Sequence, residues 1–213
     1  LGSMSVVVVY LLSVRLTLNE SISFFVGIVL ALSASFWFQA ITAEVYMLNT
    51  FLFLLLLLLA LRLEKDFSKR DWLFFSCVYG ISLSNHWPLL FLSSPGFAVL
   101  FWNRRMEILR LTPVSLVALL LGLIPYLHLY FSKDYTEFFF YGKLDSLSLV
   151  WEHIIRKEQW QMDVIQTASL KQSLKLFVDF LLFPTTELPF VSMAFVYGGV
   201  YGAFQKLEKR IFS

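Results

Sequence analysis

Long apolar stretches alternate with short polar ones along most of the chain. An α-helix needs roughly 20 residues to cross a bilayer core about 30 Å thick, and several of these stretches are shorter, so tilt or local thinning must make up the difference. The pattern predicts an all-α, polytopic transmembrane helical bundle, a single transmembrane domain over residues 1–213. Its spans are expected at about residues 4–18, 22–39, 45–62, 72–84, 87–102, 113–131 and 188–204.

The long segment between the last two spans, residues 132–187, contains two amphipathic stretches. Apolar residues recur at helical spacing at about residues 146–160 and again at about 169–183, opposite polar and basic side chains. Both stretches are predicted to form helices that lie in the membrane interface. Their cationic residues suit an anionic lipid phosphate at that depth.

Composition agrees with a membrane protein and excludes a soluble domain. Hydrophobic residues make up 58% of the chain and charged residues only 15%, whereas soluble domains carry about 25% charged residues. The net charge of +2 provides no basic field for nucleic acid. The single cysteine, Cys77, excludes an internal disulfide framework.

Basic residues gather in four places that the positive-inside rule assigns to the cytoplasm. They are Arg15, the group Arg62, Lys65, Lys69 and Arg70, the group Arg104, Arg105 and Arg110, and the group Lys206, Lys209 and Arg210. The turns near Glu44, near His86 and after Phe131 then lie on the extracytoplasmic side of an integral, multi-pass protein. The N-terminus also lies outside, so we expect an odd number of spans upstream.

Three polar stations on that side are candidates for function. Glu44, at the mouth between two spans, is interpreted as a ligand for a substrate hydroxyl, a general base or a solvated helix cap. His86, in the turn Asn85-His86-Trp87-Pro88, suits phosphate binding or proton transfer, although His and Trp also occur as interfacial belt residues.

Arg156 is the third candidate, because its guanidinium can form two parallel hydrogen bonds to a phosphate. The alternative is a solvated polar face anchored to the headgroups by Trp160. His86 and His153 have no Cys or acid at metal-ligand spacing, so no metal site is indicated.

Four stretches carry a resemblance to a known family: residues 36–49 (FWFQAITAEVYMLN), 80–88 (GISLSNHWP), 122–126 (GLIPY) and 151–160 (WEHIIRKEQW). In order and spacing they resemble the multispan protein O-mannosyltransferase family. That family, formerly described as a domain of unknown function, belongs to the GT-C superfamily of glycosyltransferases that use lipid-linked sugars. The last stretch resembles the family's RREQYG-like element, with Trp160 where Tyr is usual.

The resemblance implies transfer of a sugar, mannose by expectation, from a polyprenyl-phosphate carrier to a hydroxyl of a protein or glycan acceptor. It implies no cofactor beyond this lipid-linked donor, and a bacterial inner membrane or endoplasmic reticulum membrane as the location. The residue roles that follow are a phosphate site at Arg156 with His86 and an orienting role for Glu44. Glu158 and Gln159 would contact the sugar or support the residues that do, and Tyr46 and Asn85 are further substrate-binding candidates.

One departure from the family limits what the resemblance implies. The family's first outer loop, whose Asp-Ser-Gly-Glu-like motif would supply the catalytic acid, has no counterpart in the sequence and would lie upstream of Leu1. We therefore expect no turnover from this chain alone. The alternatives are a transporter or lipid flippase and a noncatalytic membrane scaffold. Transporters usually place charges near the bilayer midplane, whereas the polar groups here gather at one face.

Overall fold

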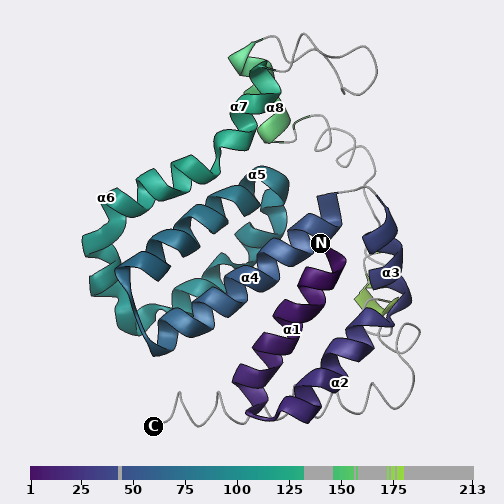
Figure 1. Cartoon of the computed structure of the whole chain (residues 1–213). Coiled ribbons are helices and arrows are strands. Elements are labelled where there is room, and N and C mark those ends of the chain that lie inside the picture. The colour runs from purple at the N-terminus through teal and green to yellow at the C-terminus, as the bar shows by residue number, and fades with distance from the viewer. Residues whose placement is uncertain are drawn as a thin grey trace. The chain divides into compact units, whose positions relative to one another are not determined.

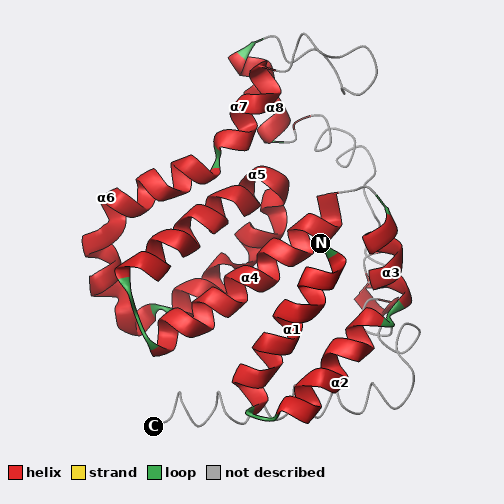
Figure 2. Ribbon diagram, viewed as in Figure 1, coloured by secondary structure: helices red, strands yellow, loops and turns green. Residues whose placement is uncertain are grey.

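The computed structural model describes residues 1–42, 45–131, 146–155 and 157, with residues 172, 174–175 and 177–179 further along the chain. Every regular element in these ranges is a helix, as predicted (Figures 1 and 2). The chain divides into two compact units. Unit 1 comprises residues 1–47 and 168–213, and unit 2 comprises residues 48–167.

Unit 1 begins with two helices, α1 (Gly2–Thr17) and α2 (Glu20–Ala31), that pack against each other as a hairpin (Figure 1). The chain reverses at Leu18, whose left-handed backbone (φ 56°) ends α1. Asn19 then begins α2, because its side-chain oxygen accepts a hydrogen bond from the Ile22 amide at 3.0 Å. This reversal lies within the polar turn that the sequence places after Arg15.

A bend of 62° separates α2 from α3 (Ala34–Ile41). The sequence predicts one span over residues 22–39, whereas the structure divides that stretch into two helices. The physical reason is Ser33, whose hydroxyl accepts a hydrogen bond from the Phe36 amide and so starts a new helix. Together the two helices have the length and hydropathy of one span.

Unit 2 contains α4 (Val45–Lys65) from Leu48 onwards, followed by α5 (Lys69–Leu100). His86 interrupts α5 with an extended backbone (φ −160°, ψ 89°), and the two arms on either side of it fold back on each other. The rings of Trp72 and Phe101 are 5.3 Å apart, although 29 residues of straight helix would separate them by about 43 Å. The arms are therefore antiparallel, and the reversal falls in the stretch that the sequence places between two apolar blocks.

The second arm of α5 contains two prolines that the local structure accommodates. Pro88 lies in the first turn after the break at His86. Amides in the first turn of a helix have no carbonyl partner within the helix, so proline costs no hydrogen bond there. Pro95 cannot donate to the carbonyl of Phe91, and the Ser94 hydroxyl donates to that carbonyl instead, at 2.7 Å. The arm thus remains helical to Leu100.

After α5 the chain continues through a short 3₁₀ helix, η1 (Trp102–Arg104), into α6 (Arg105–Gly122) and α7 (Ile124–Phe131). Two described stretches are long and apolar enough to cross a membrane, namely α4 and residues Trp102–His128. The bent pair α2 and α3 makes a third when it is counted as one span. The described part of the chain is thus a helical bundle of the polytopic membrane type.

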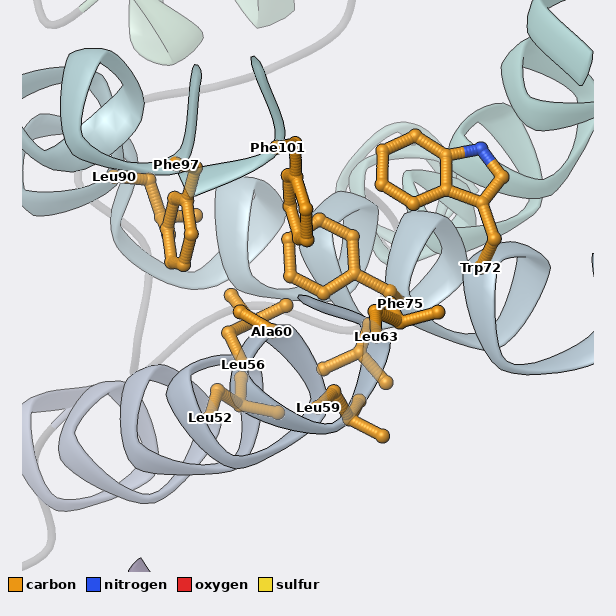
Figure 3. Close-up of a cluster of buried hydrophobic side chains, with 11 residues drawn as sticks. Leu52, Leu56, Leu59, Ala60, Leu63, Trp72, Phe75, Leu90, Phe97 and Phe101 are labelled. Atoms are coloured by element: carbon orange, nitrogen blue, oxygen red, sulfur yellow. The ribbon is translucent and has the colours of Figure 1, made fainter. Parts of the chain in front are cut away.

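The core of unit 2 lies between α4 and the two arms of α5 (Figure 3). Leu52, Leu56, Leu59 and Leu63 recur along one face of α4 and pack against aromatic residues of α5. The Phe75 ring meets the rings of Phe97 and Phe101 edge-on at 5.5 and 5.4 Å. These contacts bind the α5 hairpin to α4.

One described helix falls within the first predicted interfacial stretch, residues 146–160. It is α8 (Leu147–Ile154), and the Ser146 hydroxyl accepts from the Leu149 amide at 3.2 Å. The second predicted interfacial helix, residues 169–183, is described only at scattered positions, and the predicted span 188–204 lies outside the described residues.

Candidate functional site

The reversal of α5 creates the polar centre of unit 2, which we call the hairpin tip (residues 83–88). It contains two predicted site residues, Asn85 and His86, and both side chains are half-buried. His86 is the residue at which the backbone leaves the helical conformation. Three other elements of unit 2, namely α6, α7 and α8, contact this tip or the first arm of α5.

A glycine pair provides the closest contact, between the first arm of α5 and α6. A Cβ added to Gly80 would lie 3.0 Å from the Gly122 Cα and closer still to the carbonyl oxygen of Leu119. A Cβ on Gly122 would lie 2.7 Å from the Ile81 nitrogen and 2.8 Å from the Gly80 Cα. Only residues without side chains allow two backbones to approach this closely.

Tyr126 provides the second link, from α7. Its hydroxyl donates a hydrogen bond to the carbonyl of Leu83 at 2.9 Å. The tyrosine is placed there by the break between α6 and α7 after Gly122, and Pro125 fits the first turn of α7, where no amide is required. Residues 80–88 and 122–126 are thus joined both by the glycine contact and by a hydrogen bond.

Trp87 provides the third link, to α8. Its indole N–H donates to the backbone carbonyl of Ile154 at 2.9 Å. In α8 the side chain of Val150 is buried, whereas Trp151 is exposed and Glu152 pairs with Lys157 at 2.6 Å. Figure 1 shows α8 beside α7. The end of α8, which holds the first residues of the fourth resemblance stretch (151–154), therefore lies at the hairpin tip.

Two buried polar atoms lie near the hairpin-tip end of α4 and of the first arm of α5. Asn49 Oδ1 and Ser82 Oγ have no hydrogen-bond partner among the described residues. The ion pair between Arg62 and Asp71 joins the last turns of α4 to the first turn of α5, and only residues 66–68 separate the two helices. Counted from this ion pair, Asn49 lies about 20 Å along α4 and Ser82 about 17 Å along α5. Buried groups of this kind are rare in folded proteins and call for a specific reason.

The structure locates three of the predicted site residues and brings two of them together. Asn85 and His86 share the hairpin tip, and Tyr46 lies in the first turn of α4, about half exposed. The other candidates lie outside the described residues, namely Glu44, Arg156, Glu158 and Gln159. Within the described ranges, no three His, Cys, Asp or Glu side chains form a group that could hold a metal ion.

The fold and the site define the class of this protein: a membrane-embedded helical bundle in which α6, α7 and α8 each contact α5 at or near its reversal. The particular family follows from comparison with known proteins. The family described as the protein O-mannosyl-transferase TMEM260 N-terminal domain matches residues 4–110, half of the chain, and the chain belongs to that family. The resemblance to protein O-mannosyltransferases, which are glycosyltransferases, is thereby confirmed.

The matched range includes residues 36–49 and 80–88 and ends before 122–126 and 151–160. Comparison with curated proteins and with solved structures gives no match. What joins the last two stretches to the first part of the chain is therefore the structure itself, through Gly122, Tyr126 and Ile154.

Sequence reasoning missed Trp87, Tyr126 and the glycine pair as residues that build the site. Trp87 was interpreted only as part of an interfacial turn, although an indole N–H needs an acceptor once its ring is buried. Gly80 and Gly122 were quoted within their motifs without a role. A useful signal was present, because both stretches begin with glycine inside apolar segments, where glycine often marks close helix packing.

Proposed function

We propose that the intact protein transfers mannose from a polyprenyl-phosphate carrier to a hydroxyl of a protein or glycan acceptor, with the donor phosphate bound at the hairpin tip. The observation that carries this proposal is that residues 80–88, 122–126 and 151–155, each within a resemblance stretch, meet at one end of unit 2. Two of these stretches, residues 80–88 and 151–160, contain the residues proposed to bind the phosphate. Membership in the O-mannosyltransferase family supplies the reaction class.

The chemistry assigns a role to each polar residue. An inverting transfer of the GT-C type requires a carboxylate that deprotonates the acceptor hydroxyl and cations that stabilise the departing lipid phosphate. Arg156, with help from His86, binds that phosphate, and Glu44 orients the acceptor or the sugar. Asn85 and Tyr46 contact substrate, and Glu158 and Gln159 contact the sugar. The carboxylate base itself is assigned to the family's Asp-Ser-Gly-Glu-like loop.

The proposed side of the reaction is extracytoplasmic. The end of unit 2 opposite the hairpin tip has a surplus of basic residues around Arg62, Arg70, Arg104 and Arg105. Short basic loops favour the cytoplasm, so the tip faces the other side. The carrier lipid would then present its phosphate at headgroup depth on the side of the tip.

The test is transfer from a polyprenyl-phosphate mannose by the full-length protein and its variants in detergent or liposomes. Arg156→Ala should reduce kcat/KM by about 100-fold or more, since a charge-assisted contact to the leaving phosphate is lost. His86→Ala and Glu44→Gln should each reduce it by about tenfold or more. Arg110→Ala, an exposed arginine of α6, is the matched control and should retain wild-type activity.

Two results would contradict the proposal. The first is wild-type kcat/KM in both Arg156→Ala and Glu44→Gln. The second is solute or lipid translocation by liposomes that contain the full-length protein without release of polyprenyl phosphate. The second result would favour the transporter, whose helices are often broken, as α2 and α3 are.

A further inference from the structure

The hydrogen bond between Trp87 and α8 connects two parts of the chain that are far apart in sequence. Trp87 follows the break at His86, and its indole N–H reaches the carbonyl of Ile154, 67 residues later, at 2.9 Å. The ring also meets Phe91 edge-on at 6.3 Å, which fixes its orientation on the second arm of α5. The donor is therefore held by a packed helix, and the acceptor belongs to a short one.

The acceptor has a specific place in α8. Ile154 is the last residue of that helix, and the last four carbonyls of any helix have no amide partner within it. In a partly buried position such a carbonyl needs a donor from elsewhere, and the Trp87 indole supplies one. The bond therefore ties the C-terminal end of α8 to the hairpin tip.

Other contacts hold α8 only along part of its surface. Val150 is 7% exposed and faces the protein, whereas Trp151 is 61% exposed and Ile155 is 37% exposed. A helix of eight residues is too short to be stable on its own, so its position depends on such anchors. Val150 anchors its middle, and Trp87 anchors the end from which the chain continues towards Arg156.

We infer that Trp87 is a positioning residue for the mannosyl donor: its hydrogen bond to Ile154 holds the C-terminal end of α8 at the hairpin tip, next to His86 in the sequence of α5. Two peptide bonds separate Ile154 from Arg156 in the sequence. The inference rests on the proposed function, because it assumes a phosphate bound between these two stretches. It assigns to Trp87 no contact with substrate.

The experiment compares Trp87→Phe with Trp151→Phe in the full-length enzyme. Both variants exchange an indole for a phenyl ring within unit 2, and only the first removes the donor to Ile154. Trp87→Phe should raise the KM for polyprenyl-phosphate mannose about tenfold, the loss expected for one buried hydrogen bond. The KM for the acceptor should stay within about twofold of wild type, as should both constants in Trp151→Phe.

A second variant separates the hydrogen bond from the shape of the ring. Benzothienylalanine at position 87 keeps the bicyclic outline and replaces the N–H with sulfur, so it should fold even if Trp87→Phe does not. It should raise the donor KM as Trp87→Phe does. Hydrogen exchange of the amides of Val150 and Ile155 provides a readout without turnover, and exchange should be faster once the indole donor is removed.

The outcomes distinguish the inference from the proposed function. An unchanged donor KM, or an equal rise in the donor and acceptor KM, in the benzothienylalanine enzyme would overturn the positioning role while transfer itself persists. If the wild-type enzyme transfers no mannose from a polyprenyl-phosphate donor, the proposed function fails. Unchanged amide exchange in α8 would then also show that Trp87 does not hold this helix.

Discussion

The two ends of unit 2 are built in different ways. At the end where α4 meets the start of α5, charged side chains pair with near neighbours at the surface. Arg62 pairs with Asp71 at 3.0 Å, Arg104 pairs with Glu107 at 3.3 Å, and the Arg105 guanidinium lies 5.2 Å from the centre of the Trp102 ring. At the hairpin tip, uncharged side chains instead donate to backbone carbonyls, Tyr126 to Leu83 and Trp87 to Ile154.

The buried residues differ in the same way. Beneath the charged end, Trp72 stacks on Phe75 at 5.4 Å and donates its indole N–H to the Ser115 hydroxyl at 2.7 Å, so an apolar cluster surrounds a satisfied donor. Towards the tip, Asn49 and Ser82 are buried and lack a partner in the described part of the chain. The difference indicates that the charged end stabilises the fold, whereas the tip has retained polar groups at a cost in stability.

The largest expected effect is a loss of stability near the hairpin tip. Gly80→Ala should destabilise the protein by about 3 kcal/mol or more, because its Cβ would meet the backbone of α6 and a backbone cannot rotate away as a side chain can. Since α6 leads into α7, the bond from Tyr126 to Leu83 should weaken and transfer activity should fall as well. Thermal unfolding in detergent and a mannosyl-transfer assay measure both effects.

Gly96→Ala is the matched control, because a Cβ there would meet nothing within 4 Å. It lies in the second arm of α5, where alanine should stabilise the helix by about 0.5–1 kcal/mol. Equal unfolding temperatures for the two variants would show that the backbones of α5 and α6 are not in contact at Gly80.

The next largest effect is a loss of stability at the charged end of unit 2. Phe75→Ala should cost about 2–4 kcal/mol, since it removes a ring that contacts Trp72, Phe97 and Phe101. The KM for the donor should not change in the protein that remains folded, because Phe75 lies away from the tip. Phe74→Ala, whose ring is 52% exposed, should cost less than about 1 kcal/mol. A raised donor KM in Phe75→Ala would remove the distinction between the two ends.

A smaller effect is expected when the hydrogen bond from Tyr126 to the hairpin tip is removed. Tyr126→Phe removes one hydrogen-bond donor and leaves the carbonyl of Leu83 without it, which should cost about 1 kcal/mol. Because α7 packs against both α5 and α8, the donor KM should rise about threefold or more. Thermal unfolding and steady-state kinetics of the wild type and Tyr126→Phe measure the two effects. A stability loss with unchanged kinetics would limit Tyr126 to a structural role.

The smallest effects come from two buried serines in one arm of α5. Ser76 donates to the Trp72 carbonyl at 2.9 Å, and Ser76→Ala should cost about 0.5–1 kcal/mol. Ser82 is fully buried and has no partner among the described residues, so Ser82→Ala should leave stability unchanged or raise it by up to about 1 kcal/mol. A larger loss of stability in Ser82→Ala than in Ser76→Ala, measured by chemical unfolding, would contradict the contrast between the two ends.

Much of the fold could be predicted because membrane solvation acts on local sequence. The apolar run of α4, the Ser146 cap of α8 and the reversal near His86 all follow from residues close together in the chain. The bend at Ser33 was not predicted, because an uninterrupted apolar pattern continues through it and only the capping hydrogen bond marks the new helix.

The site was predictable as a set of motifs and not as an arrangement. Asn85 and His86 were chosen as polar residues in a turn, which is a local property. That Trp87 reaches Ile154, and Tyr126 reaches Leu83, depends on how the arms of α5 and the helices α6 to α8 pack. Hydrophobic periodicity contains no information about which distant carbonyl a buried donor will meet.

The sequence by itself determined the helical membrane class, the family, and which turns contain polar residues. These properties depend on hydropathy, local capping and motif spacing, each of which acts over about one span or less. The tertiary structure alone decided that residues 80–88, 122–126 and 151–155 meet at one end of unit 2. The physical reason is that close packing at Gly80 and Gly122 sets which backbones touch, and buried donors then bond to the carbonyls within reach.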